Sequence, residues 1–206
     1  MMRENTHEAE HKAVVRRIAP ECMVLLKSDG SFPLETPGKL ALYGNGARRT
    51  IKGGTGSGDV NVVHYVTVEE GLRDAGFTIT TQDWLDSYDA LWAESNKAFK
   101  AGIKKKIAAE GISAIMLGIG AIMTEPDYDL PMTGEGDTAV YVLSRVSGEG
   151  SDRSAIQGDF QLTQTEIKNI LQLQKQYQRF LLVLNVGGVV DLSPVADMVS
   201  NILLLS

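Results

Sequence analysis

Short, almost uninterrupted apolar runs alternate along this chain with helical segments, and this alternation limits the possible folds more than any other feature. Residues 39–43, 138–144 and 180–186 are the clearest apolar runs. Strands of this kind are buried on both faces, which requires a parallel sheet with helices on both sides. We therefore predict a doubly wound α/β domain, a flavodoxin-like sandwich with a mainly parallel sheet of five or six strands.

Two of the segments between the strands carry a helix-start signal. Thr67 and Thr163 are each followed three residues later by a glutamate, which is the spacing of a capping box. A third helix, over residues 82–110, is indicated by aromatic and leucine side chains that recur on one face. With residues 77–81 and 201–205 as further strands, the expected strand order is the flavodoxin-like 2-1-3-4-5.

The chain divides into a short polar lead and one domain. Residues 1–20 are polar apart from a few apolar side chains at helical spacing, which predict a helix that packs on the domain. These side chains are Ala13, Val14, Val15 and Ile18. Residues 21–206 form the α/β domain, because they contain no internal repeat and no long linker.

Charge and cysteine content limit the partners and the location of the protein. The 20 Lys and Arg residues against 26 Asp and Glu leave a net charge of -6, which disfavours a nucleic acid partner. The single cysteine, Cys22, permits no intrachain disulfide and lies among apolar residues, so we expect it to be buried in a protein from a reducing compartment. No signal peptide is recognisable, and no apolar run approaches the roughly 18 residues of a membrane span. We therefore expect a cytoplasmic protein with no membrane partner.

Metal and nucleotide binding have little support in the sequence. The three histidines are scattered, and an acidic cluster lacks the spacing of a calcium loop, so we interpret its carboxylates as solvated surface. The cluster consists of Glu125, Asp127, Asp129, Glu135 and Asp137. The glycine-rich segment 52–60 has neither the P-loop nor the dinucleotide-binding spacing. We expect no metal and no other cofactor.

Two glycine-rich segments follow the strands that flank the expected switch point of the sheet. Residues 44–61 and 145–159 leave these two strands at their carboxyl ends. In doubly wound sheets the ligand crevice lies at this point, so both segments should face one crevice. The next strand should bring Asn185 and Asp191 to the same rim.

Each segment carries side chains suited to sugar or proton chemistry, with a plainer alternative. In the first, Ser57 and Thr55 supply hydroxyls and Gly56 permits close approach of a neutral ligand, or the segment is a flexible loop. In the second, Glu149 lies between two glycines and suits a proton donor that reaches into a cleft, or it is a solvated loop residue. The neighbours interpreted as loop-ordering ion pairs are Arg145, Asp152 and Arg153.

Several motifs, taken in order, resemble a known family. They are Met-Val-Leu-Leu-Lys at 23–27 with Phe-Pro-Leu at 32–34, Lys-Gly-Gly-Thr-Gly-Ser-Gly-Asp-Val at 52–60, Ser-Arg-Val-Ser-Gly-Glu-Gly-Ser-Asp-Arg at 144–153 with Gly-Asp-Phe at 158–160, and Val-Leu-Asn-Val-Gly-Gly at 183–188. Together they resemble the α/β sandwich domain of glycoside hydrolase family 3, the β-glucosidase family, over residues 10–206.

The resemblance implies a retaining β-glycosidase that hydrolyses terminal β-D-glycosyl residues of β-linked oligosaccharides or of aryl and alkyl β-glycosides. In such enzymes the active site lies between a (β/α)8 barrel, which supplies an aspartate nucleophile, and this sandwich domain, which supplies the general acid/base. The resemblance makes Glu149 the acid/base and places Ser57 against the sugar.

The chain also departs from the family pattern. It contains no barrel sequence, and it stops at Ser206, where relatives continue into a Trp and a Gly-Gln-Glu-Gly-like turn. We expect a domain incomplete at its C-terminus, from a parent with the sandwich before the barrel, and no activity in the isolated chain. A bare surface where the barrel docks would favour homo-oligomers. The alternative is a non-catalytic module of the same fold that binds a carbohydrate or a protein partner.

Overall fold

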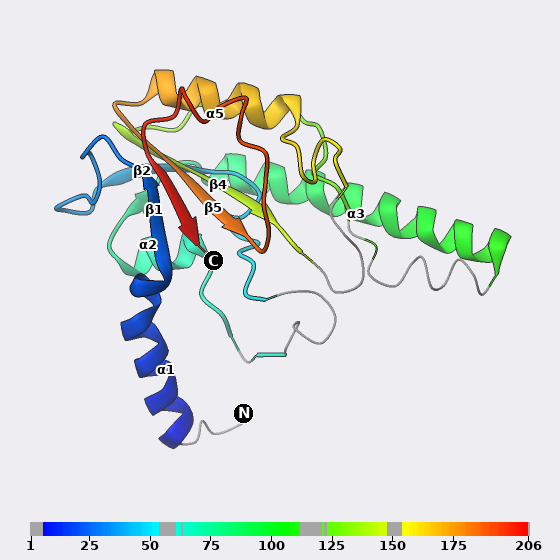
Figure 1. Ribbon diagram of the computed structural model, residues 1–206, viewed down its shortest axis with the longest axis horizontal. Helices are drawn as coiled ribbons and strands as arrows, with labels where there is room; N and C mark the ends of the chain where they lie inside the picture. Colours follow the sequence, from blue (N-terminus) through cyan, green and yellow to red (C-terminus); the bar gives the residue numbers. More distant parts are fainter. Residues whose placement is uncertain are drawn as a thin grey trace.

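The protein is built on a mainly parallel sheet of six strands in the order β1-β6-β5-β4-β2-β3 (Figure 1). The computed structural model describes residues 6–53, 61–62, 64–111, 121, 123–147 and 154–205. The strands are β1 (Met23–Lys27), β2 (Lys39–Tyr43), β3 (Thr78–Ile79), β4 (Thr138–Arg145), β5 (Arg179–Val186) and β6 (Ile202–Leu205). All neighbouring pairs are parallel except β1 and β6, which pair antiparallel at one edge.

This arrangement confirms the predicted fold and strand order. Taken in chain order, the five parallel strands lie 2-1-3-4-5, with β2 and β4 side by side at the switch point. All eight residues of β4 are buried, as its uninterrupted apolar sequence requires. β3 is shorter than the predicted strand 77–81, because the Thr81 hydroxyl, rather than its backbone, bonds both the N–H and the C=O of Leu42.

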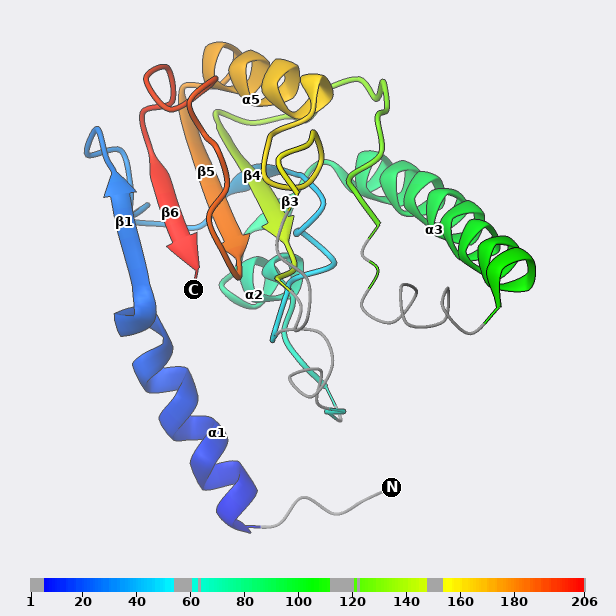
Figure 2. The same ribbon diagram turned by 45° about the vertical axis from the view of Figure 1, so that its right-hand side comes forward.

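Helices flank the strands as their start signals predict. They are α1 (Thr6–Ile18), the 3-10 turn η1 (Ala19–Cys22), α2 (Val68–Asp74), α3 (Gln82–Glu110) and α5 (Gln164–Gln176). Both predicted capping boxes form, at Thr67 with Glu70 and at Thr163 with Glu166. Only the first two turns of α3 contribute buried residues, and the rest of this helix extends beyond the sheet (Figure 2). Within the described ranges, no helix is both long and apolar enough to cross a membrane.

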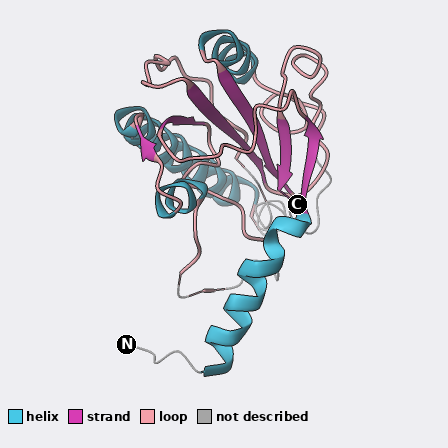
Figure 3. Ribbon diagram, turned by 90° about the vertical axis from the view of Figure 1, so that its left-hand side faces the viewer, coloured by secondary structure: helices cyan, strands magenta, loops and turns pink. Residues whose placement is uncertain are grey.

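The N-terminal helix forms but does not pack on the domain, so this part of the prediction is wrong. Every residue from 7 to 18 is exposed, and α1 projects away from the sheet (Figure 3). Pro20 lies in η1, between the helix and the edge strand β1. Proline has no N–H and disfavours helix in the residue before it, so α1 ends there without turning back over the sheet.

Burial falls from the centre of the sheet towards its β1 edge. In β6 only Ile202 is fully buried, and in β1 the first four residues are exposed. Cys22, which immediately precedes this bare strand, is exposed, in contrast to the burial expected from its apolar neighbours. The apolar sequence of β1 is therefore not matched by a covering helix among the described residues.

Candidate functional site

A cavity of about 330 Å³ lies at the carboxyl ends of β2 and β4, at the switch point of the sheet. We call it the crevice. Its walls include Ile51, from the segment that follows β2, and Arg145 and Val146, from the segment that follows β4. Described residues of both glycine-rich segments therefore line one cavity, where the switch-point argument places it.

The chain passes tightly over β4 as it leaves β2, and this places Asn45 in the crevice. A side chain on Gly44, whose φ is 92°, would put a Cβ 2.3 Å from the carbonyl oxygen of Val142. Only glycine fits such an approach. Asn45 then pairs with the backbone of Ser144, accepting from its N–H at 2.7 Å and donating to its C=O at 3.1 Å.

Glu125 lies inside the crevice, which corrects its interpretation as solvated surface. Its carboxylate accepts hydrogen bonds from the Tyr88 hydroxyl at 2.6 Å and from the Asn45 amide at 2.8 Å. Burial, followed by the negative charge of Glu166, raises its pKa to about 7. The other four carboxylates of the acidic cluster are exposed, as expected. Glu125 differs from them because its segment packs back against α3 and β4.

Arg145 closes the base of the segment that follows β4. Its guanidinium donates to both carboxylate oxygens of Glu166, at 2.7 and 2.6 Å, and to the carbonyl oxygen of Asp159 at 3.1 Å. Both side chains of the ion pair are buried, with 5% and 0% exposure. Arg145 therefore links β4, the start of α5 and the far end of the 145–159 segment.

Asn185, in β5, links the first glycine-rich segment to Ser144 near the end of β4. Its side-chain oxygen accepts from the Ile51 N–H at 2.5 Å and from the Ser144 hydroxyl at 3.1 Å, and its amide donates to the Ile51 carbonyl. Asp191, expected at the same rim, is not among the residues that line the crevice. Its carboxylate accepts from the Ser193 N–H instead, within a turn.

One wall of the crevice is aromatic and cationic. The Arg49 guanidinium lies 4.3 Å from the ring centroid of Trp92 and forms an ion pair with Asp89 at 2.5 Å. Both Arg49 and Trp92 line the cavity. A cation over an aromatic face is held by the ring quadrupole, so this wall has a defined geometry.

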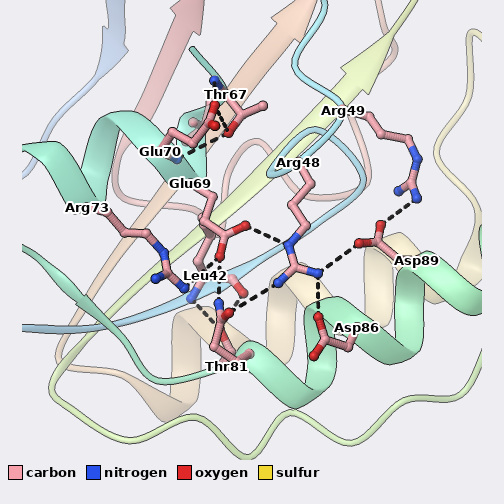
Figure 4. Close-up of polar contacts among 12 residues, drawn as sticks. Leu42, Arg48, Arg49, Thr67, Glu69, Glu70, Arg73, Thr81, Asp86 and Asp89 are labelled. Atoms are coloured by element: carbon pink, nitrogen blue, oxygen red, sulfur yellow. Dashed lines mark hydrogen bonds and ion pairs between the residues drawn. The ribbon is translucent and has the colours of Figure 1, made fainter. Parts of the chain in front are cut away.

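Arg48 shares Asp89 with Arg49 and anchors the same segment to two helices (Figure 4). It donates to Glu69 of α2 at 2.6 Å and to Asp86 and Asp89 of α3 at 2.6 and 2.8 Å. Burial of Glu69 opposes its ionisation, but the hydrogen bonds from Arg48 and Gln82 outweigh it and lower its pKa. The segment after β2 is therefore anchored to α2 and α3 between Asn45 and Ile51, which line the crevice on either side of Arg48.

We expect Arg48→Ala to lower the free energy of unfolding by about 2 kcal/mol, because it leaves three carboxylates close together without their shared cation. Urea unfolding of the purified chain measures this change. Arg73→Ala is the matched control: Arg73 also pairs with Glu69, but its side chain is 47% exposed, so the loss should stay below about 0.5 kcal/mol. Equal losses in the two variants would contradict the anchoring role of Arg48.

The predicted site residues fall partly outside the described part of the chain. Arg145 is described, and its contacts are given above. Those outside the described residues are Glu149, Ser57, Thr55, Gly56, Asp152 and Arg153. No group of three or more side chains that could hold a metal ion occurs among the residues that the structure describes. The sequence interpretation missed Glu125 and Asn45, although Asn45 between two glycines directly after a strand was a usable signal.

Comparison with known proteins identifies the family. The family model described as the glycosyl hydrolase family 3 C-terminal domain matches residues 23–205. This chain belongs to glycosyl hydrolase family 3. The resemblance seen in the sequence motifs of this family 3 domain is thereby confirmed.

Relatives and solved structures agree with this assignment. The family 3 domain is 29% identical to β-glucosidase A of Butyrivibrio fibrisolvens over 90% of its own length, and 26% identical to a β-glucosidase of Ruminococcus albus over 89%. It matches the structure of β-glucosidase 3B from Thermotoga neapolitana in complex with glucose, with a TM-score of 0.70 and 26% identity over 96% of this chain. The chain spans about a quarter of these proteins or less: 24%, 18% and 27%, respectively.

Proposed function

We propose that this family 3 domain supplies the general acid/base of a retaining β-glycosidase of the β-glucosidase type, and that Glu149 carries the proton. One observation carries the proposal: in a family 3 chain, described residues of both glycine-rich segments, Ile51 and Arg145, line one crevice at the switch point. The segment with Glu149 leaves β4 at this crevice. Arg145 holds the beginning of the segment against its far end at Asp159.

The proposed reaction has two steps. First, the Glu149 carboxyl group protonates the glycosidic oxygen while a carboxylate nucleophile attacks the anomeric carbon, so the C–O bond to the leaving group breaks and a glycosyl ester forms. Second, the Glu149 carboxylate removes a proton from water, whose oxygen attacks the anomeric carbon and releases the nucleophile. Substrates would be β-linked oligosaccharides or aryl and alkyl β-glycosides. No cofactor takes part in this scheme.

The nucleophile would come from a (β/α)8 barrel elsewhere in the parent protein. The bare edge of the sheet supports a large partner of this kind, because seven sizeable apolar side chains in and around α1 and β1 are more than 40% exposed. They are Val14, Val15, Ile18, Met23, Val24, Leu25 and Leu26. Without the barrel, the same surface would favour homo-oligomers. A cytoplasmic location stays a prediction from the sequence.

The test is hydrolysis of aryl β-glucosides by the full natural reading frame, with and without Glu149→Ala. We expect the variant to lose on the order of a hundredfold in rate on a poor leaving group, which needs protonation, and much less on an activated one. Added azide should restore turnover, because an anion can attack the glycosyl-enzyme without a general base. Glu135→Ala removes an exposed carboxylate at the opposite end of the sheet and should leave all rates unchanged.

Two other outcomes would count against the proposal. An unaffected Glu149→Ala variant would mean that the Gly-Glu-Gly segment is an ordinary solvated loop. A wild-type protein without activity on any aryl glycoside would favour the alternative, a non-catalytic module that binds a carbohydrate or a protein partner.

A further inference from the structure

The Glu125 carboxylate contacts two elements of the crevice. One oxygen accepts from the Tyr88 hydroxyl of α3, and the other accepts from the Asn45 amide in the segment after β2. Asn45 in turn bonds both backbone groups of Ser144, next to the last residue of β4. The carboxylate of Glu125 is thus linked through one side chain, that of Asn45, to the backbone of Ser144, directly before the 145–159 segment.

The main chain of Glu125 holds the other end of this segment. Its N–H donates to the Gly158 carbonyl at 3.1 Å. Gly158 has a φ of 81°, and a Cβ there would lie 2.9 Å from the backbone nitrogen and oxygen of Glu125. Such close backbone approach is possible only for glycine. Glu125 therefore contacts one end of the segment through Asn45 and the other end directly.

We propose that Glu125 is a positioning residue for the acid/base segment, holding its two ends at Ser144 and Gly158. This inference rests on the proposed function, since it needs a proton donor within that segment. A misplacement of about 1 Å in a reacting group can cost on the order of a hundredfold in rate. The contacts that fix both ends of the segment are therefore expected to matter most for the step that uses its proton.

The hydrogen-bond pattern indicates which variants separate positioning from charge. If the oxygen that faces Tyr88 carried a proton, it could donate to the Tyr88 hydroxyl, and the other oxygen would still accept from Asn45. Glutamine in the same orientation makes the same two contacts. Glu125→Gln should therefore keep the segment in place, whereas Glu125→Ala removes both contacts and leaves the Asn45 amide without this acceptor.

The kinetic test uses the full natural reading frame and the same pair of aryl β-glucosides. On the poor leaving group we expect Glu125→Ala to lose about ten- to a hundredfold in kcat, with little change in KM. On the activated leaving group the loss should stay below about threefold, and Glu125→Gln should restore the wild-type rates. Asn45→Ala should reproduce the pattern of Glu125→Ala, because it breaks the same link to Ser144.

A double-mutant cycle with Glu149→Ala tests whether the two residues act together. If Glu125 acts through the acid/base, Glu125→Ala should have no further effect on the poor leaving group in a Glu149→Ala background. An equal, multiplicative loss in both backgrounds would overturn the inference. So would an equal loss on both leaving groups, which is the signature of a merely destabilised fold.

Amide hydrogen exchange of the 206-residue chain gives a second readout that does not depend on activity. We expect faster exchange at Ser144 in Glu125→Ala, since the Ser144 N–H donates to the Asn45 side chain, and near-wild-type exchange in Glu125→Gln. Unchanged exchange in Glu125→Ala would overturn the inference. The acid/base proposal fails separately, through an unaffected Glu149→Ala variant, so the two failures can be told apart.

Discussion

Replacing Arg145 by methionine is expected to lower the free energy of unfolding by about 3 to 5 kcal/mol, the usual cost of removing one partner of a buried ion pair. The Glu166 side chain has no exposed surface, so its carboxylate would remain in the core without a cation. The substitution also removes the hydrogen bonds to the carbonyls of Ser144 and Asp159.

Urea unfolding of wild type and variants at pH 7 measures this loss. The double variant Arg145→Met with Glu166→Gln should recover part of it, because the neutral glutamine keeps the capping box with Thr163 and no charge is left buried. Lys168→Ala is the control: its ion pair with Asp129 is largely exposed, and its loss should stay below about 0.5 kcal/mol. A loss below about 1 kcal/mol in Arg145→Met would contradict the structural importance of the pair.

The ion pair between Arg145 and Glu166 joins the end of β4 to the start of α5. Arg145 ends β4, and Glu166 is the third residue of α5, where its carboxylate already accepts from the backbone N–H of Thr163. The Glu166 carboxylate therefore both completes the capping box of α5 and forms an ion pair with the last residue of β4. The intervening chain, with the predicted acid/base, leaves and returns at this pair.

The fold was predictable from the sequence because its signals are local. The apolar runs of β4 and β5 have no polar alternation, and the capping boxes at Thr67 and Thr163 define the starts of α2 and α5. The parallel order then follows from general rules of doubly wound sheets. α1 was mispredicted because helical spacing indicates an apolar face but does not show whether the domain has a surface that covers it.

The candidate site was predictable only in outline. The switch point indicated where the segments after β2 and β4 meet, since that depends on topology alone. The role of Glu125 depends on how its segment folds back over α3 and β4, and no local pattern distinguishes it from exposed neighbours such as Asp127 and Asp129. Likewise, the partner of Arg145 lies 21 residues away and could not be read from spacing.

Glu125 should also make the free energy of unfolding of the domain fall as the pH rises, and Glu125→Gln should remove this dependence. Burial and the charge of Glu166 raise its pKa to about 7, against the opposing effects of Tyr88, Arg145 and Asn45. The folded state then binds this proton more tightly than the unfolded state, whose carboxyl has its ordinary pKa of about 4.3. The stabilisation is therefore fully present below about pH 4 and is lost as the pH rises through about 7.

A shift of this size corresponds to about 3.5 kcal/mol, most of which is lost between pH 5 and pH 8. Glutamine has no proton to lose. We therefore expect the free energy of unfolding of Glu125→Gln, relative to wild type, to increase by about 2 to 3 kcal/mol over that range in urea titrations. Taking the difference between the two proteins removes the contributions of all other titrating groups.

Glu135→Gln is the matched control for this titration. The hydrogen bond from Lys39 lowers the pKa of the exposed Glu135 carboxyl, so any pH dependence of its difference from wild type has the opposite sign and lies at more acidic pH. A Glu125→Gln difference that is flat from pH 5 to pH 8 would mean that the carboxyl ionises as freely in the crevice as in water. The Glu125 carboxyl group keeps its contact with Asn45 whether it is protonated or ionised. We therefore expect its titration to change the free energy of unfolding and not the position of the 145–159 segment, which governs the rate on a poor leaving group. Stability and positioning at Glu125 can thus be measured separately.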